Sequence, residues 1–386
     1  MKFLIRFFLS IAIAIVIICI GLWASGNAHL IKAVRSTYLV GKTAPTIDDY
    51  PKFTNRTVVA SAPLPWKESK RFNQYQLKGE LLKEAKEWQT SALLVIHKDS
   101  LLFEQYWDTY SENSLTNSFS MAKSFVSLAI GAAIKEGKIK STKQKVSEFL
   151  PEFDTEEKRD IDIESLLHMS SGIDFGESYG DPFGFMAKAY YGEDLYDLTI
   201  NKTAKYSPNE IWHYQGGNSL LLSFILKKAT GKSLADYFAE KFWHPIGAKN
   251  DALWTINKEG GIERSYCCFY SNARDFARIG QLMLDSGKWR ESTLITDEYY
   301  QKSLQAVNVK DVNGKLIDYY GYQWWMSDYE GDDFYYARGI QGQYIVWVPK
   351  WDMVIVRLGH KRDPTRNVEV PSDLYTYLKV GKESMY

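Results

Sequence analysis

The hydrophobic pattern begins with a long apolar run at the N-terminus. Residues 7–23 carry no charge, and Lys2 and Arg6 precede them. As a helix this run would span roughly 26 Å, which nearly crosses the hydrocarbon core of a bilayer. We therefore expect residues 1–28 to form a membrane anchor or a signal segment. The length favours an anchor, because the apolar core of a signal peptide is usually shorter.

The charges ahead of this run predict its orientation. Positively charged flanks tend to stay in the cytoplasm, which would place the rest of the chain in the periplasm or outside the cell. Residues 7–23 would then contact the lipid bilayer. Cleavage of the segment would instead release a secreted protein.

The next part of the chain changes from irregular to regular structure. Residues 29–80 contain four prolines and no sustained periodicity, which is typical of a tether and extension packed on the surface. A helix is predicted at 81–89. Two apolar runs follow at 91–97 and 101–107, and the short turn between them predicts a β-hairpin.

The rest of the pattern is helical in the middle and strand-like near the end. Helices are predicted at 121–139, 219–229, 233–242, 273–286 and 373–380, and strands at 322–327, 334–337, 344–348 and 353–358. Strands at both ends with helices between them predict one α/β domain of the α+β kind over residues 81–386. Its antiparallel sheet would be built from both ends of the domain, flanked by helices and carrying a mostly helical insertion.

Composition and charge exclude several classes of protein. The 386 residues include 47 basic and 47 acidic side chains, so the charges cancel and we expect no nucleic-acid partner. Cys19 lies in the N-terminal run, and Cys267 and Cys268 are neighbours, which rarely bridge each other. We interpret the cysteines as small buried apolar side chains, and we expect neither a metal nor an organic cofactor.

Ser120 and Lys123 are the first candidates for chemistry. They are three residues apart at the predicted start of a helix, with Asn117 and Ser118 as possible cap residues. Side chains at this spacing share one helix face, so the amine can accept the proton of the hydroxyl or support it electrostatically. This four-residue pattern is common by chance, so other segments must support it.

Two later segments provide that support. Tyr214 stands just before a glycine pair and a predicted helix, and it could place its hydroxyl in a cleft. Gly339 and Gly342 flank the edge of a predicted strand, where backbone N–H groups can approach a substrate oxygen closely. Taken singly, each segment is equally typical of a turn or a strand-edge bulge.

Together these segments resemble the penicillin-recognising serine hydrolase superfamily. The resemblance covers about residues 85–380 and is closest to class C beta-lactamase-like esterases and 6-aminohexanoate-oligomer hydrolases. It rests on F-S-M-A-K-S-F at 119–125, L-L-H-M-S-S-G-I at 166–173, the Tyr214 segment, A-T-G-K-S-L at 229–234, A-R-D-F-A-R-I-G-Q-L at 273–282 and G-I-Q-G-Q at 339–343. It implies a beta-lactamase/transpeptidase-like fold and hydrolysis of a small ester, amide or peptide-like substrate.

The resemblance also implies roles for individual residues. Ser120 would be the acylated nucleophile, Lys123 would assist proton transfer, and Tyr214 would act as general base and general acid. The backbone N–H groups of Ser120 and Ile340 would form the oxyanion hole, with Gly339 beside them at the substrate. Tyr179 resembles a tyrosine that contributes to amide substrates in the oligomer-hydrolase branch.

The chain departs from the family pattern at two places. The usual Tyr-x-Asn reads Tyr214-Gln215-Gly216, so Asn218 would have to supply the asparagine that contacts substrate. The basic residue of the usual Lys-Thr-Gly is replaced by Ala337, and alternation along a strand should direct Arg338 to the opposite face. Both departures favour an esterase or amidase that does not require a substrate carboxylate.

Two alternatives stay open. One is a beta-lactamase or D-amino-acid peptidase of the same fold, and the other is a noncatalytic binding module tethered to the membrane. A histidine-based triad is disfavoured, because no Gly-x-Ser-x-Gly turn occurs in the sequence. For His168 we expect a structural hydrogen bond.

Overall fold

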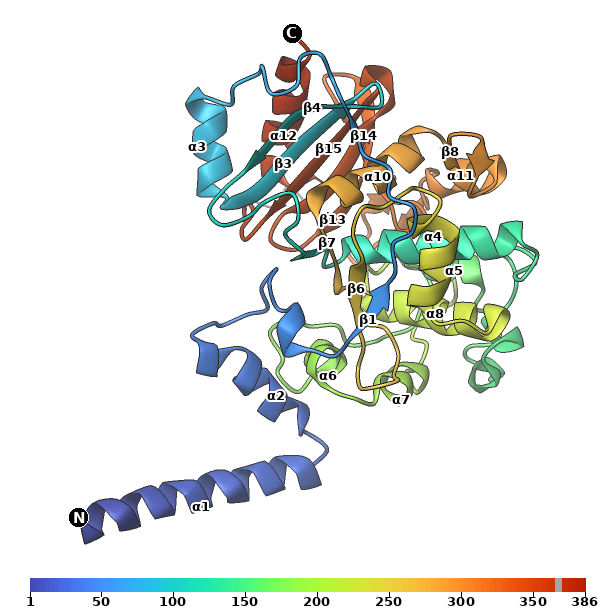
Figure 1. Cartoon of the computed structure of the whole chain (residues 1–386). Coiled ribbons are helices and arrows are strands. Elements are labelled where there is room, and N and C mark those ends of the chain that lie inside the picture. Colours follow the sequence, from blue (N-terminus) through green and yellow to red (C-terminus); the bar gives the residue numbers. More distant parts are fainter. Residues whose placement is uncertain (365–369) are drawn as a thin grey trace.

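The structure is a computed structural model that describes residues 1–364 and 370–386. A seven-stranded sheet fills the upper part of the molecule (Figure 1). The strand order is β12-β13-β14-β15-β3-β4-β2, and every pair is antiparallel except β2 with β4. The strands are β2 (Lys67–Glu68), β3 (Thr90–His97), β4 (Ser100–Tyr106), β12 (Trp325–Tyr329), β13 (Asp332–Gly339), β14 (Gln343–Val348) and β15 (Met353–Gly359).

The centre of this sheet joins the two ends of the domain. Strand β3, from the beginning of the domain, pairs with β15, from its end. Nearly every residue of both strands is buried, and their apolar runs at 92–96 and 353–356 show no alternation. The predicted fold class, an antiparallel sheet from both ends with helices around it, is therefore confirmed.

Helices cover both faces of the sheet (Figure 1). One face packs on α3 (Gly79–Glu87) and α12 (Ser372–Ser384), and the other on α10 (Ala273–Leu284). Beneath α10 lies α4 (Met121–Lys135), whose residues from Met121 to Ala133 are all buried. Strands β13 and β14 contribute side chains to the cores on both faces of the sheet, and α4 contacts both strands.

The lower part of the molecule is mostly helical, with a second sheet of order β1-β6-β7-β5. Its strands are β1 (Asn55–Val58), β5 (Thr116–Asn117), β6 (Ala252–Thr255) and β7 (Phe269–Ser271). Its helices are α5 (Ile163–Leu167), α6 (Phe185–Tyr191), α7 (Leu195–Ile200), α8 (Gly216–Thr230) and α9 (Leu234–Phe238), continued by Ala239–Trp243. Short elements are Tyr38–Val40, Tyr50–Lys52, Val146–Glu148, Pro151–Phe153, Pro349–Trp351, β8 (Lys288–Trp289), β9 (Ser292–Thr293), β10 (Val309–Lys310) and β11 (Leu316–Ile317). Helix α11 (Asp297–Ser303) lies higher, beside α10 and β8 (Figure 1).

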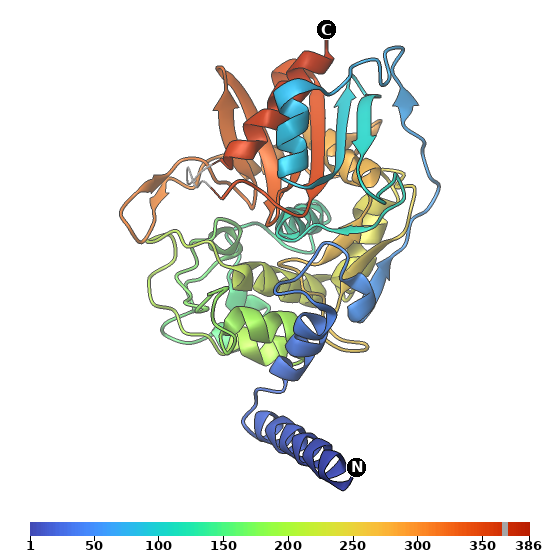
Figure 2. The same cartoon turned by 90° about the vertical axis from the view of Figure 1, so that its left-hand side faces the viewer.

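The N-terminal helix α1 (Lys2–Ala24) projects away from the body in Figures 1 and 2. Among its residues none is buried, and it is long and apolar enough to cross a membrane. It is followed by α2 (His29–Ser36), which packs against α6. The apolar helix predicted at the N-terminus is therefore present.

Residues 29–80 contribute a strand to the second sheet in addition to packing on the surface. Strand β1 forms one edge of the second sheet by pairing with β6, from Asn55 opposite Thr255 to Val58 opposite Ala252. The backbone N–H of Asn117 donates to the carbonyl of Ile47 at 2.8 Å, only three residues before Ser120. The extension is thus built into the domain.

For Cys267 and Cys268 the prediction of burial is confirmed, but the prediction that they do not bridge each other is wrong. The two are joined to each other by a disulfide. The bond lies at a turn in which Cys268 adopts a φ of 69°, a left-handed conformation that the sequence pattern does not reveal.

Candidate active site

The turn before α4 sets the position of Ser120. Helix α4 begins at Met121, so Ser120 is the residue immediately before the helix and Asn117 does not cap it. Instead the Asn117 side chain accepts a hydrogen bond from the backbone N–H of Phe119 at 2.9 Å. Phe119 has a φ of 44°, an uncommon conformation for an aromatic residue, and this sharp bend presents Ser120 at the surface of a cleft.

Ser120 and Lys123 lie within hydrogen-bond distance. The Lys123 ammonium donates to Ser120 Oγ at 2.9 Å and to the carbonyl of Tyr266 at 2.9 Å. Lys123 is 1% exposed, so it is held in a position from which water is largely excluded. A proton can therefore move between this amine and the hydroxyl without rearrangement of the backbone.

Tyr214 lines the same cleft. Its ring centroid lies 5.0 Å from the Lys123 ammonium. The ring packs at 5.4 Å against Trp325 and at 6.0 Å against Tyr320, which fixes its plane. The structure thus brings Ser120, Lys123 and Tyr214 together, although 90 residues of sequence separate the last two and no local pattern could have placed them.

Gly339 brings strand β13 against the Ser120 turn. A Cβ atom at Gly339 would lie 2.3 Å from the Ser118 carbonyl oxygen, so no larger residue fits. Ile340 follows and lines the cleft together with Ser120. Among the described residues, neither the Ser120 nor the Ile340 backbone N–H donates to another group. Both residues line the cleft, so their backbone amides stay candidates for an oxyanion hole.

The cleft has a volume of about 440 Å³, within the range of ligand sites. Its walls combine aromatic rings with charged side chains. Trp325 forms part of the wall, whereas its neighbour Trp324 does not line the cleft. The lining residues include Ser120, Glu177, Tyr179, Trp212, Tyr214, Trp325, Arg338, Ile340 and Arg362.

Arg338 corrects the expectation that its side chain is directed away from the site. Alternation holds, since Ala337 packs into the helical core while the Arg338 guanidinium lies 3.4 Å from the Trp325 ring centroid. The cleft, however, extends over Trp325 to that second face, so Arg338 still lines it. With Arg362, the cleft contains two guanidinium groups.

Tyr179 also lines the cleft, and it lies beside a carboxylate that the sequence analysis did not single out. The Tyr179 hydroxyl donates to Glu177 Oε1 at 3.3 Å, and the backbone N–H of Gly216 donates to Glu177 Oε2. Burial raises the pKa of Glu177 above its ordinary value, while the charge of Lys123 and the Gly216 N–H act in the opposite direction. Only its position two residues before Tyr179 could have drawn attention to it.

Asn218 does not reach the cleft. It is 1% exposed, and its Oδ1 accepts a hydrogen bond from the Ser171 hydroxyl at 2.6 Å. Its Nδ2 donates to the carbonyl of Gln215 at 3.3 Å, so the side chain ties two loops together in the interior. Contrary to our expectation, it lies where it can support the cleft but not line it.

The histidines are also separate from the cleft. His168 packs against Tyr322 with ring centroids 4.7 Å apart, and its buried Nε2 has no hydrogen-bond partner among the described residues. The structural hydrogen bond expected of His168 is therefore not made by Nε2 within the described part of the chain. Burial lowers the pKa of His168 to about 4, so the ring is neutral near pH 7.

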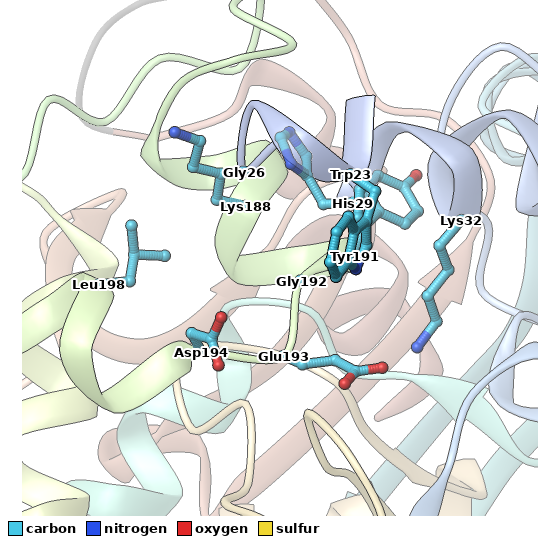
Figure 3. A pocket seen from close by; sticks show the side chains of 11 residues that line it. Trp23, Gly26, His29, Lys32, Lys188, Tyr191, Gly192, Glu193, Asp194 and Leu198 are labelled. Carbon is cyan, nitrogen blue, oxygen red and sulfur yellow. The ribbon is translucent and has the colours of Figure 1, made fainter. Parts of the chain in front are cut away.

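A hollow outside the Ser120 cleft lies between the end of α1 and the α6–α7 region (Figure 3). Its lining includes Trp23 from α1, Lys32 from α2 and Lys188 from α6. It contains none of the residues expected to carry chemistry. The Ser120 cleft is therefore the candidate active site.

Comparison with known proteins identifies the family that the sequence matches. The Beta-lactamase family model matches residues 80–376. A 6-aminohexanoate-dimer hydrolase of Paenarthrobacter ureafaciens is 27% identical over 305 residues, which are 71% of this chain and 74% of the relative.

Solved structures share the fold. A Bacillus anthracis protein provisionally assigned as a 6-aminohexanoate-dimer hydrolase superposes with a TM-score of 0.73 at 20% identity, over 86% of this chain and 90% of the other. A family VIII carboxylesterase gives a TM-score of 0.62 at 14% identity, over 80% of this chain and 99% of the other. At these identities the likeness establishes the architecture around the cleft and leaves the substrate to be argued from the residues.

Proposed function

Because the chain belongs to the Beta-lactamase family of hydrolases, we propose that it is a serine hydrolase that cleaves esters or amides through an acyl-Ser120 intermediate. The observation that carries this proposal is the 2.9 Å hydrogen bond between the buried Lys123 ammonium and Ser120 Oγ. It joins a proton-transfer group to a hydroxyl at the surface of the cleft.

In the proposed reaction, Ser120 Oγ attacks the carbonyl carbon of the substrate. The Oγ–carbon bond forms while the proton of Oγ passes to Lys123 as the neutral amine or to Tyr214 as the phenolate. The tetrahedral oxyanion is held by the N–H groups of Ser120 and Ile340, and each such donor typically contributes about 2.7–4 kcal/mol. The carbon–oxygen or carbon–nitrogen bond then breaks, and the proton passes through Tyr214 to the leaving group.

Deacylation reverses the direction of proton transfer. Lys123 or Tyr214 takes one proton from water, the resulting hydroxide attacks the acyl carbon, and the proton passes to Oγ as its bond to the acyl carbon breaks. The products are a carboxylic acid, an alcohol or amine, and Ser120 in its original protonated form. Every step uses groups of this chain and one water molecule.

Covalent labelling tests the nucleophile. The full chain should react with a fluorophosphonate probe, and mass spectrometry should place the adduct on Ser120. Ser120→Ala should abolish labelling, and Lys123→Met should slow it at least 100-fold because the proton acceptor is lost. Lys135→Met is the matched control, since Lys135 ends the same helix at an exposed position. An adduct that persists in folded Ser120→Ala would disprove the proposal.

A second candidate is hydrolysis of a substrate that carries a carboxylate, such as a beta-lactam or a D-amino-acid peptide. Arg338 and Arg362 favour it, because guanidinium groups suit carboxylates. Turnover of a chromogenic cephalosporin, compared with a short nitrophenyl ester and a linear amide, separates the two. Cephalosporin turnover exceeding that of both other substrates would favour the second candidate.

We further propose that residues 7–23 anchor the protein in a bilayer with the hydrolase domain outside the cytoplasm. Helix α1 supports this by its length and hydropathy, and the charges of Lys2 and Arg6 support the orientation. The disulfide between Cys267 and Cys268 is compatible with an oxidising compartment.

A further inference from the structure

A second cavity, distinct from the cleft that Arg338 lines, also reaches Ser120. It has a volume of about 470 Å³, and among the described residues that line it only Asp181 carries a charge. In contrast, the cleft that contains Tyr214 is lined by Glu177, Asp311, Arg338, Arg362 and Asp363. We call this second cavity the apolar chamber, and its apolar walls include Leu30, Ala33, Pro45, Met186, Ala187 and Ile340.

The two cavities meet at the reacting atoms. Ser120, Tyr179 and Ile340 line both of them, whereas Tyr214 lines only the charged cleft. In the proposed reaction Tyr214 gives a proton to the leaving group, so the leaving group must lie in the cleft. A substrate carbonyl at Ser120 then directs its acyl part to the other side, into the apolar chamber.

One wall of the apolar chamber comes from the segment that follows α1. This segment, residues 30–45, lies outside the 80–376 region matched by the family model. Two interactions fix it: the Gln341 side chain donates to the carbonyl of Pro45 at 2.7 Å, and His29 Nε2 lies 2.9 Å from the carbonyl oxygen of Pro182. The first couples the wall directly to the residue that follows Ile340.

From this arrangement we infer that the apolar chamber is an acyl-binding site formed jointly by the N-terminal segment and the catalytic domain. The preferred substrates are esters or amides of apolar, medium-chain acyl groups. This inference rests on the proposed function, because it takes Ser120 as the nucleophile and Tyr214 as the donor to the leaving group. The acyl chain displaces water from the apolar walls, which supplies binding energy in proportion to its length.

The test uses the full chain in detergent and two series of esters. The first varies the acyl group from acetate to octanoate with p-nitrophenol as leaving group, below micelle-forming concentrations. The second varies the alcohol of acetate esters over the same lengths. Each added acyl methylene should raise kcat/KM by up to about fourfold, and added alcohol methylenes should have little effect.

Variants then locate the effect. Ala33→Phe in α2 and Ala187→Phe in α6 should each lower kcat/KM for octanoate at least tenfold while acetate changes less than threefold. Val34→Phe is the matched control, since Val34 is the next residue of α2 and is 42% exposed. It should leave both series unchanged. The second chamber variant keeps the test valid if the first does not fold.

The outcomes separate this inference from the proposed function. Hydrolysis that depends on Ser120 but is insensitive to acyl length would overturn the apolar chamber and leave the nucleophile in place. An effect of Ala33→Phe and Ala187→Phe on the alcohol series would also overturn it, because it would reverse the two cavities. Hydrolysis or labelling that survives in Ser120→Ala would instead disprove the proposed function.

Discussion

Gly339 determines how closely the Ser120 turn and the end of β13 approach. A Cβ atom there would collide with the Ser118 carbonyl oxygen, and the strand would have to move away. Gly339→Ala should therefore shift the Ile340 amide and lower kcat/KM by about 100-fold to 1,000-fold, the usual cost of an oxyanion donor. Steady-state kinetics on a short nitrophenyl ester measures the change.

The control for this substitution is Gly21→Ala in α1, where no atom lies within 4 Å of the added methyl group. It should retain the activity of the unaltered chain. Circular dichroism should show that Gly339→Ala still folds, because one displaced strand end is a local change. If folded Gly339→Ala keeps full activity, the Ile340 amide does not stabilise the transition state.

His168 gives the protein a specific response to acid. Its pKa is lowered to about 4 by burial, whereas an unfolded histidine has a pKa near 6.5. Between these values the unfolded chain binds the proton more readily, so this contribution to stability is complete above about pH 6.5 and is lost as the pH falls towards about 4. The loss amounts to at most about 3 kcal/mol.

Thermal denaturation across this pH range tests the assignment. His168→Phe keeps an aromatic ring against Tyr322 but cannot take up a proton. Its melting temperature should therefore fall less than that of the unaltered chain between pH 6.5 and 4.5. Equal pH dependence in the two proteins would mean that His168 is not the group responsible.

At the scale of single residues, the sequence predicts what depends on local spacing. Ser120 and Lys123 are three residues apart, so helical geometry alone brings them together. The positions of Glu177 and of the two guanidinium groups in the cleft depend on how distant loops fold onto one another. Alternation along β13 correctly separated Arg338 from Ala337, but it could not show that the cleft extends around the strand.

The same difference holds for whole elements. The central strands β3, β14 and β15 were predicted, because strands buried on both faces appear as apolar runs. Strand β1 was missed, since it has four residues and pairs with β6 almost 200 residues later. Short strands whose partners are distant carry too little local pattern to be recognised.

The contribution of the N-terminal extension is tested by two truncations. Removal of residues 1–26 should leave melting temperature and activity nearly unchanged, because α1 has no buried residue. Removal of residues 1–58 should take away Ile47, Phe53 and Val58 from the core. At about 1.5–3 kcal/mol each, together with the β1–β6 pairing, this loss exceeds about 5 kcal/mol and should leave most of the protein unfolded.

Urea denaturation of the purified proteins measures this difference in the free energy of unfolding. The shorter truncation serves as the control for the longer one. Equal stability of the two would show that residues 27–58 are an independent appendage. That result would also conflict with the hydrogen bond between Asn117 and Ile47.

At the scale of the whole molecule, the proposed role of α1 as a membrane anchor can be tested directly. The full chain should remain with the membrane fraction after carbonate extraction, and the form without residues 1–26 should be found in the supernatant. Intact-mass measurement of the full chain should show residues 1–28 still present. A mature N-terminus near residue 28 would instead establish a cleaved signal segment.

The hydrogen bond from Gln341 to Pro45 links the hydrolase domain to a segment that lies ahead of the family region. In evolutionary terms, the parts that carry out the reaction and the wall that selects the acyl group can change separately. Replacement of the segment around residues 30–45 would change which acyl groups are accepted and leave the catalytic residues unchanged. Relatives of this protein should therefore differ in acyl-group selectivity according to the residues that precede their shared domain.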